Sequence, residues 1–475
     1  MMNEQTSVIR QSLSHDIHRP HYHFLPPSNW MNDPNGLLFW KGQTHLFYQH
    51  NPYGPLWGNM SWGHAVSDDL IHWRDLPLAM VPTPGGSDES GCFSGSAVDN
   101  NGVPTLIYTA TRGEHCEIQT QCIATSHDDM LTWEKHPGNP VISEVPAITK
   151  QNSDFRDPYV WRGEDGWYMV LGSRIEDGSG IVFLYRSQDL VDWEYLNPLL
   201  EGTDPKYGTI WECPNFFKLG DKWVLIISAH TGHSTDTVFY YVGDFIGHRF
   251  VPEYTDVLDY GTLYAPLSYV DGQQRRILFG WIREARSEVD QRLAGWSGVQ
   301  AIPRMLSLDD KNRLHMQPVP ELASIRQKHL HHTANTLEAN QLLVESRNLD
   351  IEANYASDAS GEFGLTLLAS PDGYEYARVS YNADSQKLMI HKVSPETNGA
   401  ESVHIRSVPH RLAPGEALSL RILLDGSVLE VIANERTSLT GRVYPCHHDN
   451  QQLRLYGPPA ALSSLDIWEM PSIWQ

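Results

Sequence analysis

The feature that most constrains the fold of this chain is a module that occurs five times between residues 30 and 281. In each copy a short strand leads through a glycine-containing turn into an apolar strand. The turn glycines are Gly42, Gly102, Gly166, Gly220 and Gly272. The strands after them are Leu46-Phe47-Tyr48, Leu106-Ile107-Tyr108, Tyr168-Met169-Val170, Val224-Leu225-Ile226 and Ile277-Leu278-Phe279. A repeat of 52 to 64 residues built from short strands predicts a β-propeller with five blades.

A second repeat has the same spacing. Its three near copies are Ser67-Asp68-Asp69-Leu70-Ile71-His72-Trp73, Ser126-His127-Asp128-Asp129-Met130-Leu131-Thr132-Trp133 and Ser187-Gln188-Asp189-Leu190-Val191-Asp192-Trp193, with a weaker fourth at 243–250. A turn of Ser and Asp followed by Leu and Trp is typical of an outer hairpin. We expect each tryptophan to pack between neighbouring blades and to serve the fold alone.

One position in the module carries polar side chains that suggest chemistry. Eight or nine residues before the turn glycines stand Asp33, Ser94, Asp157, Glu212 and Tyr264. The first strands of propeller blades line one central cavity, so these residues should point into a single pocket. Three of the five carry carboxyl groups, which predicts a catalytic site.

The three carboxyl groups have different neighbours. Asp33 stands in Trp30-Met31-Asn32-Asp33-Pro34-Asn35-Gly36, which alone could be only a turn, although Asn32 could also bind a substrate hydroxyl. Asp157 follows Arg156, which either closes a blade as an ion pair or lowers the pKa of Asp157 so that it stays ionised. Glu212, in Trp211-Glu212-Cys213-Pro214, has the most apolar surroundings, and burial would raise its pKa as a general acid requires.

Two carboxyl groups in different environments match glycoside hydrolysis. One protonates the leaving oxygen, and the other attacks the sugar or directs water. The 15 tryptophans also suit a sugar-binding cleft, since an indole packs on the apolar face of a sugar ring.

The organisation changes beyond residue 320. We expect the propeller at 15–320, a linker with a short helix at 321–335, and a β-sandwich at 336–475. The sandwich is indicated by alternating strands such as 377–381, and by Asp425-Gly426 between two apolar strands, a strong hairpin signal. The linker histidines His329, His331 and His332 do not have the spacing of a zinc site, and we expect a solvated face there and no metal.

Composition excludes several classes of protein. The net charge of −23 argues against nucleic acid or an anionic membrane as partner. The sequence has no apolar run of about 18 residues, so we expect no membrane-spanning helix. The polar segment 1–19 has no secretory signal pattern, and the five cysteines have no paired spacing. We therefore expect reduced thiols and a cytoplasmic location.

At these residues the chain resembles glycoside hydrolase family 32, the invertases, fructan exohydrolases and sucrose-6-phosphate hydrolases. The resemblance covers nearly the whole chain. It includes His23-Phe24, residues 30–36, Gln49-His50-Asn51-Pro52, Trp62-Gly63-His64, Phe93-Ser94-Gly95-Ser96-Ala97, Arg156-Asp157-Pro158, Trp211-Glu212-Cys213-Pro214, Tyr264-Ala265-Pro266, Gly295-Trp296-Ser297-Gly298, Pro303-Arg304 and the sandwich segment 425–431.

The resemblance implies a five-bladed propeller followed by a β-sandwich. It implies that Asp33 is the nucleophile, Glu212 the general acid/base and Asp157 the stabiliser of the transition state. By the same resemblance, the fructose subsite would be lined by Asn32, Gln49, Trp57, Phe93, Ser94, Arg156, Cys213, Tyr264 and Trp281.

The expected activity is that of a retaining β-fructofuranosidase acting on sucrose or short fructans, without a cofactor or metal. Alternatives are a sucrose-6-phosphate hydrolase, which would need a basic contact such as Arg112, and an exo-fructanase on inulin or levan. A fructosyltransferase and a non-catalytic sugar-binding propeller are further alternatives. The expected partner is a small sugar, and the sequence leaves open whether the chain forms a homo-oligomer.

Overall fold

The structure is a computed structural model that describes residues 2–149, 153–176, 178–230, 237–395 and 401–474. Two compact units divide the chain. The first comprises Met1–Arg10, Phe24–Asp259 and Leu263–Val319, and the second comprises Gln11–His23, Tyr260–Thr262 and Pro320–Gln475. The segment 321–335, expected as a linker with a short helix, lies in the second unit and holds the 3-10 helix η2 (Pro320–Ile325) and the strand β23 (Gln327–His332).

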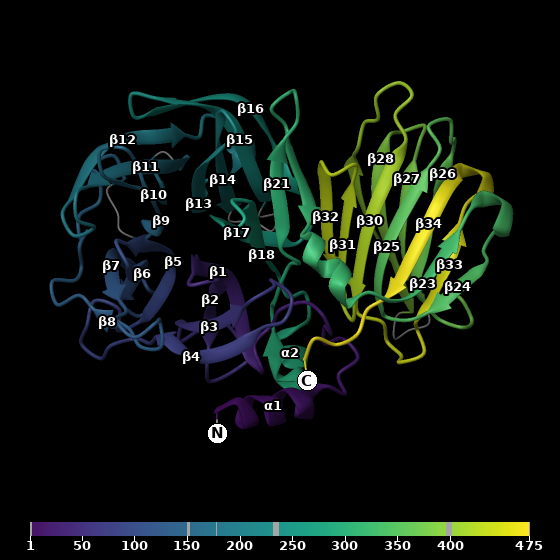
Figure 1. The fold of residues 1–475 in the computed structure, drawn as a ribbon, viewed down its shortest axis with the longest axis horizontal. Helices are drawn as coiled ribbons and strands as arrows, with labels where there is room; N and C mark the ends of the chain where they lie inside the picture. The colour runs from purple at the N-terminus through teal and green to yellow at the C-terminus, as the bar shows by residue number, and fades with distance from the viewer. Residues whose placement is uncertain (1, 150–152, 177, 231–236, 396–400, 475) are drawn as a thin grey trace. The chain divides into compact units, whose positions relative to one another are not determined.

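Five mainly antiparallel sheets build the first unit (Figure 1). Blade 1 consists of β1 (Asn29–Trp40), β2 (Gln43–Asn51), β3 (Ser61–Ser67) and β4 (Arg74–Met80). Blade 2 consists of β5 (Gly91–Asn100), β6 (Val103–Arg112), β7 (Ile118–Thr125) and β8 (Glu134–Lys135). Blade 3 consists of β9 (Arg156–Arg162), β10 (Trp167–Arg174), β11 (Gly180–Ser187) and β12 (Trp193–Glu201).

Blade 4 consists of β13 (Ile210–Leu219), β14 (Lys222–His230), β15 (Thr237–Ile246) and β16 (Arg249–Asp259). Blade 5 consists of β17 (Leu263–Val270), β18 (Arg276–Ile282), β21 (Arg304–Leu308) and β22 (Leu314–Pro318). Two short strands between β18 and β21 close the ring. β19 (Trp296–Ser297) pairs in parallel with β1, and β20 (Val299–Gln300) pairs with β18, so the same segment joins blade 5 to blade 1.

The repeated hairpin tryptophans pack between blades, as the sequence predicts. The ring of Trp73 in blade 1 lies 5.9 Å from Phe279 of blade 5, and that of Trp133 in blade 2 lies 5.5 Å from Phe47 of blade 1. Trp193 of blade 3 packs against the apolar cluster that includes Val98 of blade 2. Blades 1, 2 and 3 are thus each bound to the preceding blade of the ring by a tryptophan, which buries apolar area at these three interfaces.

Two six-stranded sheets build the second unit. One contains, in spatial order, β23, β34 (Leu462–Glu469), β25 (Asn348–Tyr355), β30 (Leu418–Asp425), β31 (Val428–Ala433) and β32 (Thr437–Arg442). The other contains β24 (Leu342–Glu345), β33 (Gln452–Tyr456), β26 (Glu362–Ala369), β27 (Tyr376–Asn382), β28 (Lys387–Pro395) and β29 (Glu401–Pro409). The predicted hairpin turns at Gly426, whose φ of 57° suits glycine. A five-bladed propeller and a β-sandwich are confirmed as the fold class.

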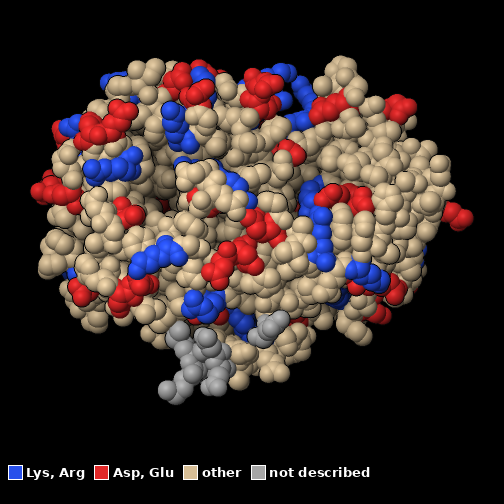
Figure 2. Space-filling view, viewed as in Figure 1, with Lys and Arg blue, Asp and Glu red and all other residues tan. Residues whose placement is uncertain are grey.

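Helices are few among the described residues. They are α1 (Met2–Leu13), α2 (Glu288–Ala294) and the 3-10 turns η1 (Pro205–Tyr207), η2, η3 (Ala334–Thr336) and η4 (Pro459–Ala461). None of the helices in the described part of the chain has the length and apolar character to cross a membrane. Figure 2 shows acidic and basic side chains interspersed on the face of the molecule that it draws.

Candidate active site

Every first strand of the propeller carries the same irregularity. At one point two consecutive residues face a single residue of the second strand, which is a β-bulge. The bulged pairs are Asn32-Asp33, Phe93-Ser94, Asp157-Pro158, Cys213-Pro214 and Ala265-Pro266. In blades 3 to 5 the first bulged residue has a positive φ, between 47° and 65°. A bulge re-aims the side chains beside it, so five bulges at one level can direct five blades toward one point.

The bulges also correct the register expected from the sequence. We predicted one common position for the three acids, but they occupy three adjacent positions around the bulge. Asp33 is the second bulged residue of its strand, Asp157 is the first, and Glu212 directly precedes the bulge. The rearranged backbone still brings all three side chains to the same place.

That place is a cavity of about 450 Å³, within the range of small-molecule sites. All five residues at the predicted position line it. So do all nine residues that the resemblance assigns to the fructose subsite: Asn32, Gln49, Trp57, Phe93, Ser94, Arg156, Cys213, Tyr264 and Trp281. Trp57, with 55% of its surface exposed, stands at the open side with its ring 6.1 Å from Phe93. Arg112 is not among the lining residues and pairs with Glu89.

Asp33 is held by side-chain hydrogen bonds. Its Oδ2 accepts from the hydroxyl of Ser94 at 2.6 Å, and its Oδ1 accepts from the amide of Asn32 at 3.0 Å. Burial raises the pKa of Asp33, and the negative charge of Glu212 adds to this, while the hydrogen bonds from Ser94 and Asn32 oppose it. The two donors fix the orientation of the carboxylate and leave it facing the cavity.

Asp157 is buried, with 7% of its surface exposed. Its Oδ2 accepts from the backbone N–H of Cys213 at 2.8 Å. Burial raises the pKa of Asp157 to about 7, and the positive charge of Arg156 only partly opposes this. The sequence predicts that Arg156 keeps Asp157 ionised, but in the structure desolvation outweighs the guanidinium, which is turned toward another carboxylate.

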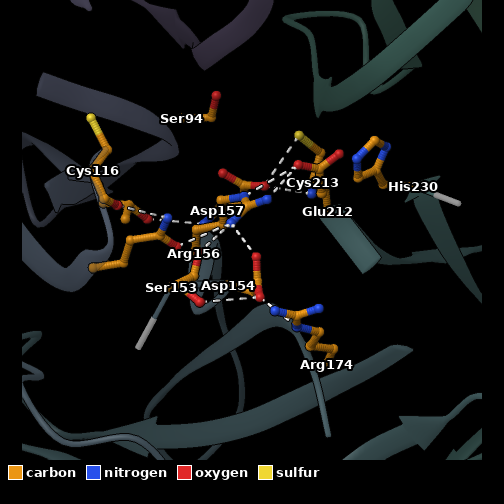
Figure 3. A network of polar contacts seen from close by, with 12 residues as sticks. Ser94, Cys116, Ser153, Asp154, Arg156, Asp157, Arg174, Glu212, Cys213 and His230 are labelled. Atoms are coloured by element: carbon orange, nitrogen blue, oxygen red, sulfur yellow. Dashed lines mark hydrogen bonds and ion pairs between the residues drawn. The ribbon is translucent and has the colours of Figure 1, made fainter. Parts of the chain in front are cut away.

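That other carboxylate is Glu212 (Figure 3). Arg156 Nη2 donates to Glu212 Oε1 at 2.7 Å and its Nε donates to the same oxygen at 3.2 Å. The hydroxyl of Tyr264 donates to Glu212 Oε2 at 2.5 Å. The sequence predicts apolar surroundings for Glu212, whereas the structure gives it an ion pair and a side chain that is 20% exposed. The sequence misses this because Arg156 lies one blade away.

Cys213 joins the two aspartates. Its Sγ lies 3.6 Å from Asp33 Oδ2 and 3.4 Å from Asp157 Oδ2. Burial, with the neighbouring carboxylates, raises the pKa of the Cys213 thiol well above its usual value. A thiol that keeps its proton between two carboxylates is a donor to them and a poor nucleophile.

Sequence reasoning missed seven residues on the cavity wall: His115, Cys116, Gln119, Ser153, Asp154, Ile210 and His230. Most come from loops or strand ends that carry no repeat signal. Gln119 and Asp154 accept hydrogen bonds from Arg156 Nη1, at 3.1 and 3.4 Å, and so hold the guanidinium that contacts Glu212. A set of described side chains with the spacing of metal ligands lies in the second unit, not here.

Models of the N-terminal and C-terminal domains of glycosyl hydrolases family 32 match residues 23–318 and 321–469. A sucrose-6-phosphate hydrolase from Escherichia coli is 34% identical, over 96% of this chain and 94% of that protein.

Two solved structures are similar over nearly their whole length. Fructan 1-exohydrolase IIa from Cichorium intybus has a TM-score of 0.82 and 28% identity, covering 96% of this chain and 98% of that one. A β-fructofuranosidase from Bombyx mori has a TM-score of 0.83 and 30% identity, covering 99% and 98%. With both domain models matched and a relative above 30% identity along 94% of its length, the chain belongs to glycosyl hydrolase family 32.

Proposed function

We propose that this protein is a retaining β-fructofuranosidase, which cuts a terminal non-reducing β-D-fructofuranosyl unit from sucrose or a short fructan. The observation that carries the proposal is the joining of three carboxylates from three blades in one cavity. The Cys213 thiol touches Asp33 and Asp157, and Arg156 binds Glu212. The relatives are named as a sucrose-6-phosphate hydrolase, a β-fructofuranosidase and a fructan exohydrolase. All three names describe enzymes that hydrolyse a fructoside bond.

In the first step, a carboxylate oxygen of Asp33 attacks the anomeric C2 of fructose. The bond between C2 and the glycosidic oxygen breaks, and that oxygen takes a proton from Glu212. Ser94 and Asn32 hold Asp33 in line for the attack. The products of this step are a free alcohol, which is glucose when sucrose is the substrate, and a fructosyl ester on Asp33.

In the second step, water attacks C2 of the ester and gives a proton to Glu212. The bond to Asp33 breaks, so both carboxyl groups return to their starting states. Two displacements at C2 retain the configuration, and retention predicts that the carboxyl groups of Asp33 and Glu212 lie about 5–5.5 Å apart.

The contacts of Glu212 indicate which oxygen carries the acidic proton. A guanidinium can only donate hydrogen bonds, so Oε1, which faces Arg156, must act as acceptor. A phenol hydroxyl can either donate or accept, so Tyr264 can turn its proton away and accept from a protonated Oε2. We therefore assign the transferred proton to Oε2.

Asp157 is proposed to bind ring hydroxyls of fructose and to offset the positive charge that develops at C2. It can do so only when ionised, and its pKa of about 7 in the free protein places that ionisation near neutral pH. The activity of the free enzyme should therefore rise as pH rises toward 7.

The cavity favours a sugar without phosphate. Arg156 is the one Lys or Arg among the described lining residues, and its guanidinium already contacts Glu212 and Asp154. A phosphate bound to Arg156 would also lie close to these carboxylates. Hydrolysis of sucrose 6-phosphate remains the second candidate function, because the E. coli relative bears that name and His115 and His230 line the wall.

The test is a comparison of kcat/KM on sucrose, sucrose 6-phosphate, inulin and levan, with Asp33→Asn and Glu212→Gln as controls. We expect sucrose to be hydrolysed faster than its 6-phosphate, and each control to lose about 10³-fold or more in rate. Product analysis at high sucrose distinguishes hydrolysis from fructosyl transfer. A protein that binds sucrose and releases no glucose would contradict the proposal.

The five free cysteines agree with a reducing compartment, and we propose a cytoplasmic location.

A further inference from the structure

The outer face of the sandwich carries a cluster of two histidines and one aspartate that the proposed catalysis does not use. His329 and His331 lie on β23, and Asp466 lies on the neighbouring strand β34 (Figure 1). The three potential ligand atoms all lie within 4.8 Å of one another. The sequence predicts a solvated linker face here, because the histidine spacing alone does not match a zinc site. Strand pairing supplies the missing third ligand.

The register explains why the three side chains meet. His331 pairs directly with Asp466, and His329 pairs with Trp468, so His329 is the diagonal neighbour of Asp466. Residues two apart on a strand share a face. Between them Leu330 pairs with the fully buried Ile467, so the opposite face is the core side and the cluster looks into solvent.

The geometry already resembles a ligand set. His329 Nε2 and His331 Nδ1 each lie 2.8 Å from the same oxygen, Asp466 Oδ1. The rings of His329 and Trp468 are stacked at 4.8 Å with 7° between their planes, which limits how the His329 ring can turn. A histidine held by a stacked ring is a partly pre-oriented ligand, so less side-chain entropy is lost on binding.

The neighbouring charges do not oppose a cation. The guanidinium of Arg326 lies 3.5 Å from the centre of the Trp468 ring, but it also pairs with Asp350 and Glu352. Arg421 pairs with the same two carboxylates, so two positive and two negative charges balance in this cluster. The histidines are half exposed, at 48% and 53%, so a metal ion and its remaining water ligands can reach them.

We propose that His329, His331 and Asp466 bind a divalent transition-metal cation of the Zn²⁺, Ni²⁺ or Cu²⁺ class. Two imidazoles and one carboxylate suit these ions, whereas Ca²⁺ and Mg²⁺ prefer oxygen ligands alone. With metal–nitrogen distances of about 2.0–2.1 Å, the exposed imidazoles need only a small rotation to surround one ion. Each histidine would present a lone pair at the nitrogen that faces Asp466 and keep its proton on the other nitrogen, and water would complete the coordination.

The ion would link an edge strand to the strand beside it. Among the described strands, β23 lies at the end of its sheet and pairs with β34 alone. A ligand that binds the folded state and not the unfolded one stabilises the fold, so Zn²⁺ should raise the unfolding temperature of the protein that contains this site.

The test is titration of the full-length, tag-free protein with Zn²⁺ by calorimetry, and with Cu²⁺ followed by electron paramagnetic resonance. We compare wild type with His329→Asn, His331→Asn and Asp466→Asn, and use His448→Asn, an exposed histidine of the same unit, as the matched control. Unfolding curves without metal establish that each variant is folded.

We expect one Zn²⁺ per chain, a Cu²⁺ spectrum split by two nitrogens, and affinity at least about tenfold weaker in each ligand variant, the loss that removal of even an outer-shell partner causes. The Zn²⁺-dependent rise in unfolding temperature should disappear with the ligands and persist in His448→Asn. Equal Zn²⁺ affinity in wild type and the three ligand variants would overturn the proposal, as would a loss in His448→Asn as large as theirs.

Discussion

Replacing Asp157 with asparagine keeps the size of the side chain and removes its charge. The carboxyl group is buried, and its pKa is raised from 3.8 to about 7 because desolvation outweighs the attraction of Arg156. The folded protein therefore keeps this proton up to about pH 7, whereas the unfolded chain releases it near pH 4. Between these values the folded state binds more protons, so the free energy of unfolding must fall as pH rises.

The magnitude follows from the two pKa values. The difference between 3.8 and about 7 corresponds to about 4 kcal/mol once Asp157 is fully ionised, at pH above 7. Asparagine carries no charge to desolvate, and its side-chain oxygen can still accept the N–H of Cys213. We expect Asp157→Asn to resemble wild type in stability near pH 4 and to exceed it by up to a few kcal/mol near pH 8.

The assay is urea unfolding at a series of pH values from 4 to 8, with the midpoint and slope compared at each pH. Asp310→Asn, an exposed aspartate on the turn between β21 and β22, is the matched control and should leave the pH dependence unchanged. In the same samples, Asp157→Asn should lose about 10³-fold or more in kcat/KM. Parallel stability curves for wild type and Asp157→Asn, or a variant less stable at every pH, would refute the reasoning, because Asp157 would then be a stabilised anion.

Four further predictions concern separate contacts. The acidic limb of kcat/KM on sucrose should have an apparent pKa near 7, set by Asp157 in the free enzyme, and a limb near pH 4 in the pH–rate profile would contradict this. Arg156→Lys keeps the charge but loses the double contact to Glu212 Oε1, so steady-state kinetics should show a fall in kcat of about 10²-fold, and an unchanged kcat would remove Arg156 from the mechanism. Gly298 has a φ of 81°, and an added Cβ would lie 1.8 Å from the carbonyl oxygen of Met31, so Gly298→Ala should lower the urea midpoint of unfolding. Gly361 also has a positive φ but has open space around it, so Gly361→Ala should lower the midpoint by less. In the second unit, burial lowers the pKa of His23, but hydrogen bonds to Asp425 and Glu430 raise it to about 9, so its contribution to stability is complete below pH 6.5 and should be lost as pH rises through 9. His23→Gln leaves two carboxylates buried, so urea unfolding at pH 6 should give a free energy of unfolding lower by about 3–5 kcal/mol. Equal stability of His23→Gln and wild type at pH 6 would contradict a charged imidazole.

Local signals predicted the architecture well because propeller blades are defined by nearby residues. The turn glycines, the apolar second strands and the hairpin tryptophans each lie within one blade, and the structure has them where the repeat places them. The position of Asp33, Asp157 and Glu212 on first strands was predictable for the same reason.

Features that depend on contacts between blades could not be read from the chain. The neighbours of Glu212 in sequence are apolar, but its charged partner Arg156 comes from blade 3 and its hydroxyl partner Tyr264 from blade 5. The bulges shift the three acids by one or two residues relative to each other, which a count from the turn glycines does not reveal. His331 likewise meets Asp466 only through the pairing of strands 135 residues apart.

The most direct test of the catalytic geometry is mass spectrometry on Glu212→Gln, quenched during its reaction with a fructosyl fluoride. The three carboxylates are proposed to meet so that Asp33 attacks C2. In Glu212→Gln the ester should still form from a fructosyl fluoride, whose leaving group needs no protonation. It should accumulate there, because the glutamine cannot accept the proton of the water that hydrolyses it. We predict one fructosyl unit on the peptide that contains Asp33, absent from Asp33→Asn. A fructosyl unit on another residue, or a first product with inverted configuration at C2, would contradict the account.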